Sequence, residues 1–175
     1  MDTEKKVRRQ SSFWANLFKT HAEKNELSEL LTSTPPFSTF TDKDIELLMP
    51  IMHNRIFAAN EYIYFQDDPG TAFYFIQEGE VSLEIKFTES KKLNVGHYKK
   101  GDIFGELSML ENEKRYASAI AVKDSKLIVI FKPDLDEFID KYPRKGILIL
   151  RGISQIFAQR FRNLTRDYIN FFQGN

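Results

Sequence analysis

The sequence has 175 residues, 42% of them hydrophobic, and no formal net charge, which suits one ordinary domain with a full core. It has no cysteine, so disulfides, thiolate metal sites and cysteine nucleophiles are excluded, and the scattered His21, His53 and His97 offer no metal-ligand spacing. No run of about 18 apolar residues and no apolar signal-peptide region appears, so we expect a soluble, cytoplasmic protein with no membrane span. Because most hydrolase and metal chemistries lack their residues here, we also expect that the protein is not an enzyme.

The charges are unevenly distributed along the chain. Residues 31–140 carry 12 basic and 19 acidic side chains, whereas residues 141–175 carry 7 basic ones against Asp167 alone. The basic C-terminal segment is therefore a solvated face, a lid over an anionic ligand, or a docking surface for nucleic acid or an acidic partner.

Residues 1–34 are predicted to form an N-terminal tail and a helix. Pro35 and Pro36 end this helical pattern, and Thr41 supplies an N-cap for a second short helix that begins near Asp42. The first helix has an aromatic face at three- and four-residue spacing, made by Phe13, Trp14, Leu17, Phe18 and His21.

Residues 35–143 contain short runs rich in Val, Ile, Phe and Tyr, separated by turn sequences. Such close spacing predicts an antiparallel β-roll, or jelly roll, with short flanking helices, in an α+β chain that is mostly β. The expected strands are 55–57, 62–65, 72–77, 81–87, 93–98, 116–122 and 127–132.

The helical period returns after Pro133. Residues 134–142 form a short helix, Pro143 ends it, and residues 144–175 form one long C-terminal helix of the same domain. An apolar stripe close to a heptad seam runs along this helix. It consists of Leu150, Ile153, Phe157, Phe161, Leu164, Tyr168 and Phe171.

The strongest signal is the stretch from Gly101 to Leu110, GDIFGELSML, followed by RYASA from Arg115 to Ala119. It resembles the phosphate-binding cassette of the cyclic-nucleotide-binding domain family, which includes the catabolite activator protein, the regulatory subunits of cyclic-AMP-dependent protein kinase and the cyclic-nucleotide-gated channels. The stretch from Gly70 to Val81 resembles the earlier hairpin of that family. The resemblance covers roughly residues 35–165.

The cassette residues suit the three groups of a cyclic nucleotide. Gly105 lets the backbone approach closely, and a helical turn from Glu106 to Leu110 would direct N–H groups toward an anion. Arg115 can place its guanidinium against a phosphate oxygen, and Glu106 can accept a hydrogen bond from the ribose 2′-hydroxyl. Taken alone, each residue also fits a turn, a solvated acid or a structural ion pair.

The resemblance implies a ligand site and a lid. In relatives that prefer cyclic GMP, the residue after the cassette arginine is a threonine, and here it is Tyr116, which favours cyclic AMP while leaving cyclic GMP or another cyclic nucleotide open. The implied ligand-binding residues are Phe104, Gly105, Glu106, Leu107, Ser108, Arg115, Tyr116 and Ala117, and the implied base lid is Arg160, Leu164 and Thr165.

The resulting prediction is a regulatory sensor of a cyclic nucleotide, with no metal and no further cofactor. It would signal to an unknown protein partner through a change of its C-terminal helix, which in the catabolite activator branch also forms a homodimer seam. No DNA-binding module is expected in this chain. The alternative is a degenerate fold that acts as a scaffold through the aromatic face of Phe13, Trp14 and Phe18.

Overall fold

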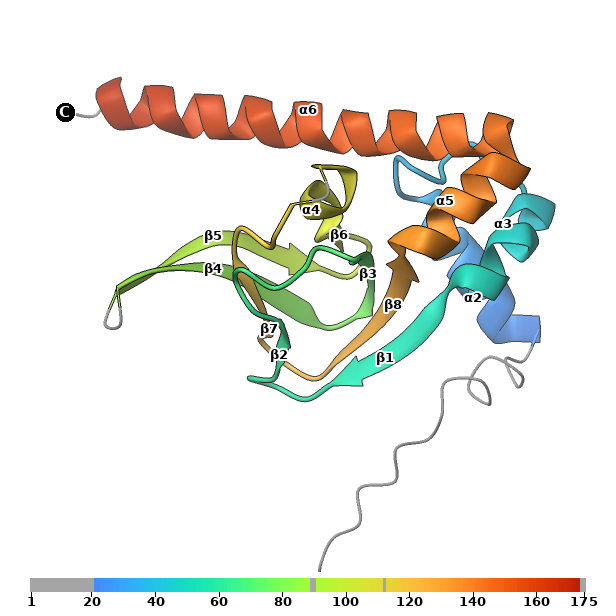
Figure 1. Ribbon diagram of the computed structural model, residues 1–175, viewed down its shortest axis with the longest axis horizontal. Helices are drawn as coiled ribbons and strands as arrows, with labels where there is room; N and C mark the ends of the chain where they lie inside the picture. Colours follow the sequence, from blue (N-terminus) through green and yellow to red (C-terminus); the bar gives the residue numbers. More distant parts are fainter. Residues whose placement is uncertain (1–20, 89–90, 112, 174–175) are drawn as a thin grey trace, which may run out of the picture.

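A computed structural model of the chain describes residues 21–88, 91–111 and 113–173, apart from the side chains of residues 21–23, 108, 109 and 111. Helices lie at one end of a β-roll, and a long C-terminal helix runs along its side (Figure 1). This arrangement confirms the predicted α+β fold with an antiparallel roll and a long last helix.

In the described part of the chain, two helices precede the roll. Helix α2 spans His21–Thr32, and α3 spans Asp42–Leu48 and continues into the 3-10 turn η1, Met49–Ile51. Thr41 is the N-cap of α3, where its hydroxyl and the Asp44 carboxylate form a capping box. The N-cap predicted at Thr41 is thus confirmed. The predicted aromatic face of Phe13, Trp14, Leu17 and Phe18 lies outside the described residues, as does the side chain of His21.

The strands form two antiparallel four-stranded sheets. One has the order β1-β8-β3-β6 and the other β2-β7-β4-β5. The two-residue strand β6 was not predicted, because two residues carry no alternation. The strands are β1 (His53–Phe57), β2 (Tyr62–Tyr64), β3 (Ala72–Glu78), β4 (Glu80–Thr88), β5 (Lys91–Lys99), β6 (Ile103–Phe104), β7 (Ser118–Ala121) and β8 (Ser125–Phe131).

The described second half of the chain contains three more helices. Helix α4 spans Glu106–Glu111, α5 spans Lys132–Lys141 with Pro133 in its first turn, and α6 spans Pro143–Gln173. Pro133 fits there because the first turn of a helix needs no N–H from that residue. Although α6 has 31 residues, neither it nor another helix in the described ranges is long and apolar enough to cross a bilayer.

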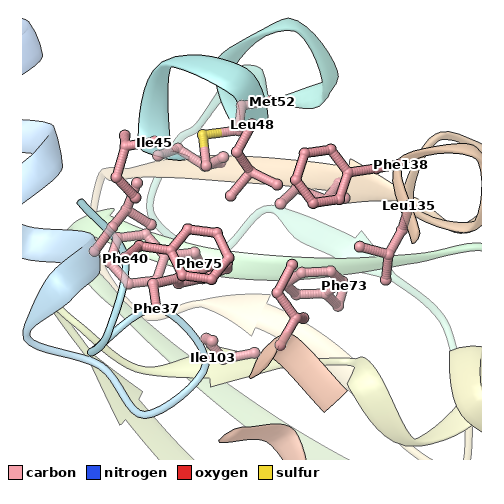
Figure 2. Packing of buried hydrophobic residues seen from close by; sticks show 14 of the residues in the cluster. Phe37, Phe40, Ile45, Leu48, Met52, Phe73, Phe75, Ile103, Leu135 and Phe138 are labelled. Carbon is pink, nitrogen blue, oxygen red and sulfur yellow. The ribbon is translucent and has the colours of Figure 1, made fainter. Parts of the chain in front are cut away.

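Apolar packing fixes α6 to one end of the roll. Figure 2 shows Phe37 and Phe40 from the loop after α2, Phe73 and Phe75 from β3, and the neighbouring core side chains around them. Ile149 and Ile153 of α6 are buried in the same cluster, whereas the part of α6 beyond residue 160 is exposed. The first half of α6 is therefore anchored, and its second half projects along the side of the second sheet.

Candidate functional site

A cleft of about 690 Å³ lies between α6, α4 and the inner face of β4 and β5. Its walls are mostly apolar, with a few charged and polar groups at one side, which is typical of sites for small organic ligands. The lining residues are Leu83, Ile85, Val95, Tyr98, Gly105, Glu106, Leu107, Tyr116, Phe157, Arg160, Phe161, Asn163, Leu164 and Asp167.

Gly105 forms the part of the wall that lies over Arg115. Its φ of 77° is in the left-handed region, and a Cβ there would lie 2.9 Å from Nη1 of Arg115. Nη1 donates a hydrogen bond of 2.6 Å to the carbonyl oxygen of Gly105, and Nη2 donates one of 2.6 Å to that of Ala72. Glycine is required here by both the backbone and the close approach of the guanidinium.

Two tyrosines hold Arg115 from the core side. The Arg115 guanidinium carbon lies 4.2 Å from the ring centre of Tyr64 and 5.7 Å from that of Tyr74, within cation–π range. Burial raises the pKa of both tyrosine hydroxyls above their ordinary values, so both rings stay neutral. Only 3% of Arg115 is exposed, which makes it a buried cation behind the cleft rather than a part of its lining.

Glu106 is the first residue of α4, and its carboxylate faces α6. Although only 2% of Glu106 is exposed, its Oε1 atom accepts a hydrogen bond from Nη1 of Arg160. Arg160 also donates through Nη2 to the carbonyl oxygen of Ile103. Burial raises the pKa of Glu106, and the positive charges of Arg160 and Arg115 offset part of that effect. The ion pair joins the cassette to α6.

Tyr98 and Tyr116 complete this side of the cleft. The guanidinium carbon of Arg160 lies 4.9 Å from the centre of the Tyr98 ring, and Tyr98 and Tyr116 both line the cleft. Burial raises the pKa of Tyr116 to about 12, so its hydroxyl is neutral at ordinary pH.

The predicted site residues divide into two groups. Gly105, Glu106, Leu107 and Tyr116 line the cleft, as do Arg160 and Leu164 of the predicted lid. Phe104 and Ala117 are instead buried in the core between the sheets, and Arg115 stands behind Gly105. Thr165 is exposed, and its hydroxyl donates a hydrogen bond to the carbonyl oxygen of Phe161. The side chain of Ser108 lies outside the described residues.

Sequence patterns did not identify several of the residues that line the cleft. Leu83 and Ile85 of β4 and Tyr98 of β5 were read only as strand residues, and Asn163 and Asp167 only as polar positions of a helix. Strand alternation could have placed Leu83 and Ile85 together on one face, but not under α6. Among the described residues, no three His, Asp or Glu side chains come together as metal ligands.

Comparisons with known proteins agree with this geometry. The sequence profile described as "Cyclic nucleotide-binding domain" matches residues 54–142. The chain is 27% identical to the cyclic AMP receptor protein of Thermus thermophilus over 81% of its own length and 64% of that protein. It is 31% identical to a cAMP-dependent protein kinase regulatory subunit of Hypocrea atroviridis over 74% of its own length and 26% of that protein.

A solved structure shares the fold. The chain superposes on a cyclic nucleotide-binding domain from Methylobacillus flagellatus with a TM-score of 0.73 at 22% identity, covering 81% of this chain and 80% of that one. The chain spans 64% or less of the two curated relatives named above, so the match concerns one domain of each.

Proposed function

Since the chain belongs to the cyclic nucleotide-binding domain family, we propose that it is a regulatory sensor that binds cyclic AMP in the cleft under α6. The carrying observation is that Gly105 and Glu106 line one wall of the cleft while Arg115 lies directly behind Gly105. A close backbone, an acceptor and a buried cation are the three groups that a cyclic nucleotide requires.

The phosphate is assigned to Gly105. Because glycine has no side chain, the anion can approach the backbone there. The Arg115 guanidinium lies directly behind this backbone, where its Nη1 atom donates a hydrogen bond to the carbonyl oxygen of Gly105. A buried cation attracts an anion more strongly than an exposed one, since water screens it less. Tyr64 and Tyr74 keep the guanidinium at this depth through their ring faces.

The ribose is assigned to Glu106. Its Oε1 atom binds Arg160, and its second carboxylate oxygen is the acceptor that we assign to the 2′-hydroxyl. The base then extends toward Tyr116 and the apolar side chains of Leu83 and Leu164. With tyrosine rather than threonine after the cassette arginine, we favour cyclic AMP over cyclic GMP.

The response is assigned to α6. A ligand hydroxyl on Glu106 changes the surroundings of Arg160, so ligand binding and the position of α6 are coupled through one ion pair. The outer half of α6 exposes an apolar stripe that a second copy of the chain or another protein would cover. We assign no catalytic step to the cleft.

Thermal unfolding with added nucleotides tests this proposal. Cyclic AMP at about 100 times its Kd should add about 2.7 kcal/mol of stability. Cyclic GMP, cyclic CMP and 2′-deoxy cyclic AMP should stabilise less at equal concentration, and 5′-AMP, which is not cyclic, serves as the control. If millimolar cyclic nucleotide gives no shift, the fold is a scaffold with a degenerate cleft and the proposal fails.

A further inference from the structure

The side of α6 that faces away from the roll carries a row of arginines. Ile149 and Ile153 are buried and mark the side of the helix that packs on the domain. Successive residues of an α-helix are turned by about 100°, so the position of a residue in the sequence gives its direction around α6. By this measure, four exposed side chains share an arc of about 60° on the opposite side: Arg144, Arg151, Arg162 and Arg166. We call this row the arginine ridge.

The arginine ridge is long, straight and uniformly basic. From Arg144 to Arg166 it extends for about 33 Å, at about 1.5 Å per residue. Figure 1 shows α6 as one unbroken helix along an edge of the molecule. Asp167, the one acidic residue of α6, is turned about 100° away from Arg166. In the described part of the chain no carboxylate pairs with the ridge, and Arg162 donates to the neutral side chain of Gln159.

The rest of the domain carries the opposite charge. Residues 31–140, which include the whole roll, have 19 acidic and 12 basic side chains. Figure 1 shows α6 along one side of the roll, so the two charges are separated in space. An extended anionic surface would attract the ridge and repel the roll. Such a surface would therefore orient the molecule with the outer side of α6 toward it.

Two features favour a lipid surface over nucleic acid. A straight ridge contacts a flat surface at all four arginines at once, whereas the phosphates of a duplex lie on a curved surface. Ile147 and Ile169 lie on or next to the ridge near its two ends, and they are 56% and 47% exposed. Apolar side chains beside basic ones insert at the boundary between lipid headgroups and acyl chains, but they gain little from a phosphate backbone.

We propose that the arginine ridge docks α6 on a membrane surface that contains anionic phospholipids. A planar guanidinium binds a phosphate group through two hydrogen bonds, which suits the phosphodiester of a lipid headgroup. Each basic side chain near such a surface strengthens binding by about fivefold, so four together contribute on the order of several hundredfold. This inference does not depend on the proposed function, because the cleft lies on the other side of α6, where Arg160 and Leu164 line it.

Flotation of the full chain with phospholipid vesicles tests the ridge. At about 0.1 M salt the parent should bind vesicles of equimolar phosphatidylserine and phosphatidylcholine, and it should not bind vesicles of phosphatidylcholine alone. Salt at about 0.5 M should release it, because the charges are then screened. Arg151→Gln should weaken binding to the anionic vesicles by about fivefold, and replacing all four ridge arginines by glutamine should weaken it by more than about a hundredfold.

The matched control changes the net charge equally but away from α6. Replacing four exposed lysines by glutamine should weaken vesicle binding by less than about threefold at about 0.1 M salt. These lysines are Lys24, Lys43, Lys99 and Lys114. If the fourfold ridge variant fails to fold, the four single variants carry the same test. A parent that does not bind the anionic vesicles, or ridge variants that bind them as the parent does, would overturn the proposal. Binding confined to a short DNA duplex in the same buffer would also overturn it and make the ridge a nucleic-acid surface.

Discussion

The Arg160 guanidinium and the Glu106 carboxylate are bonded across 54 residues of sequence, from a partly buried position of α6 to the buried start of α4. The side chain of Arg160 is 33% exposed and that of Glu106 only 3%, so most of the burial falls on the acid. Removing the arginine leaves a buried carboxylate without its counter-charge, which is more costly than losing the pair altogether.

A double-mutant cycle measures this pair. Arg160→Met should destabilise the protein by about 2 kcal/mol, and adding Glu106→Gln should restore more than half of that loss. The measurement is urea unfolding, with Arg166→Met, an exposed arginine one and a half turns further along α6, as the control. Strict additivity of the two substitutions would show that the ion pair contributes nothing.

Arg115 is expected to provide the charge that draws the phosphate. Replacing Arg115 by Ala should weaken cyclic AMP binding by about 30- to 150-fold, or about 2 to 3 kcal/mol, because the buried positive charge behind Gly105 is lost. Calorimetric titration is the measurement, since the lost bonds to Gly105 and Ala72 also change stability. The control is Arg162→Ala, which removes an exposed arginine. Unchanged affinity in a folded Arg115→Ala protein would mean that this cation does not serve the ligand.

Gly152 allows α6 to touch the loop after α2. A Cβ on Gly152 would overlap backbone atoms of Pro35 and Pro36, which cannot move aside as a flexible side chain would. Gly152→Ala should therefore destabilise the protein by about 1 to 3 kcal/mol, although alanine is the better helix former. Ser154→Ala, on the exposed face of the same turn, should change stability by less than about 0.5 kcal/mol in the same urea experiment. Equal stability of both variants would argue against close packing at the prolines.

The Asp44 carboxylate should make the free energy of unfolding depend on pH. Burial raises its pKa, but hydrogen bonds from Lys145 and Thr41 outweigh burial and hold the pKa below the ordinary value of 3.8. When the pKa of a carboxyl group is lower in the folded than in the unfolded state, its charged form stabilises the fold at pH values above the unfolded-state pKa. This stabilisation is lost as the pH falls through the folded-state pKa. Asp44→Asn should thus cost about 1 to 2 kcal/mol at pH 5 to 7 and progressively less below about pH 4.

Denaturant unfolding of parent and variant at pH 7, 5, 4 and 3 gives this difference directly. Glu46→Gln is the control, because Glu46 is exposed on the same helix. A difference that stays constant down to pH 3 would exclude the charge of Asp44 as its source.

Local patterns in the sequence predicted the elements of the fold but not the contacts between them. The N-cap at Thr41 depends on neighbouring residues and appears as expected, and the helix predicted at 134–142 is present as α5, which includes Pro133 in its first turn. The hydrogen bond from Arg160 to Glu106 joins distant segments of the chain. It depends on the direction of α6 relative to the roll, which the hydrophobic periodicity of a sequence does not give. The position of a residue in the motif does not give its depth either, since Phe104 and Ala117 belong to the motif and are buried in the core.

The missed tyrosines show the same limit. Alternation places Tyr98 on one face of β5, yet only the fold shows that Arg160 lies over its ring and that Gly96 makes room for it. The sequence likewise predicted a role for Arg115 but not the carbonyl oxygens that it binds. Every residue has such a backbone atom, so residue type does not indicate which ones Arg115 contacts.

The outer half of α6 should form a dimer. Phe161, Tyr168 and Phe171 lie on one stripe at near-heptad spacing and are 70%, 63% and 68% exposed, so they need a cover that the described part of the chain does not give. A second copy provides one if the two helices pair in parallel about a two-fold axis, an arrangement that brings each stripe residue near its own copy. In the alternative, Trp14 and Phe18 of the same chain would pack on this stripe instead of a second copy.

Sedimentation at micromolar concentration decides between these covers. The parent should be a dimer, and Phe171→Glu should be a monomer, because two-fold symmetry would place two carboxylates at the seam. Asn170→Glu adds the same charge about 100° around the helix from Phe171, off the stripe, and should leave the dimer intact. A truncation after Asn163 should also be a monomer. If the parent is a monomer with and without cyclic nucleotide, no dimer forms and the N-terminal segment becomes the better account of the stripe.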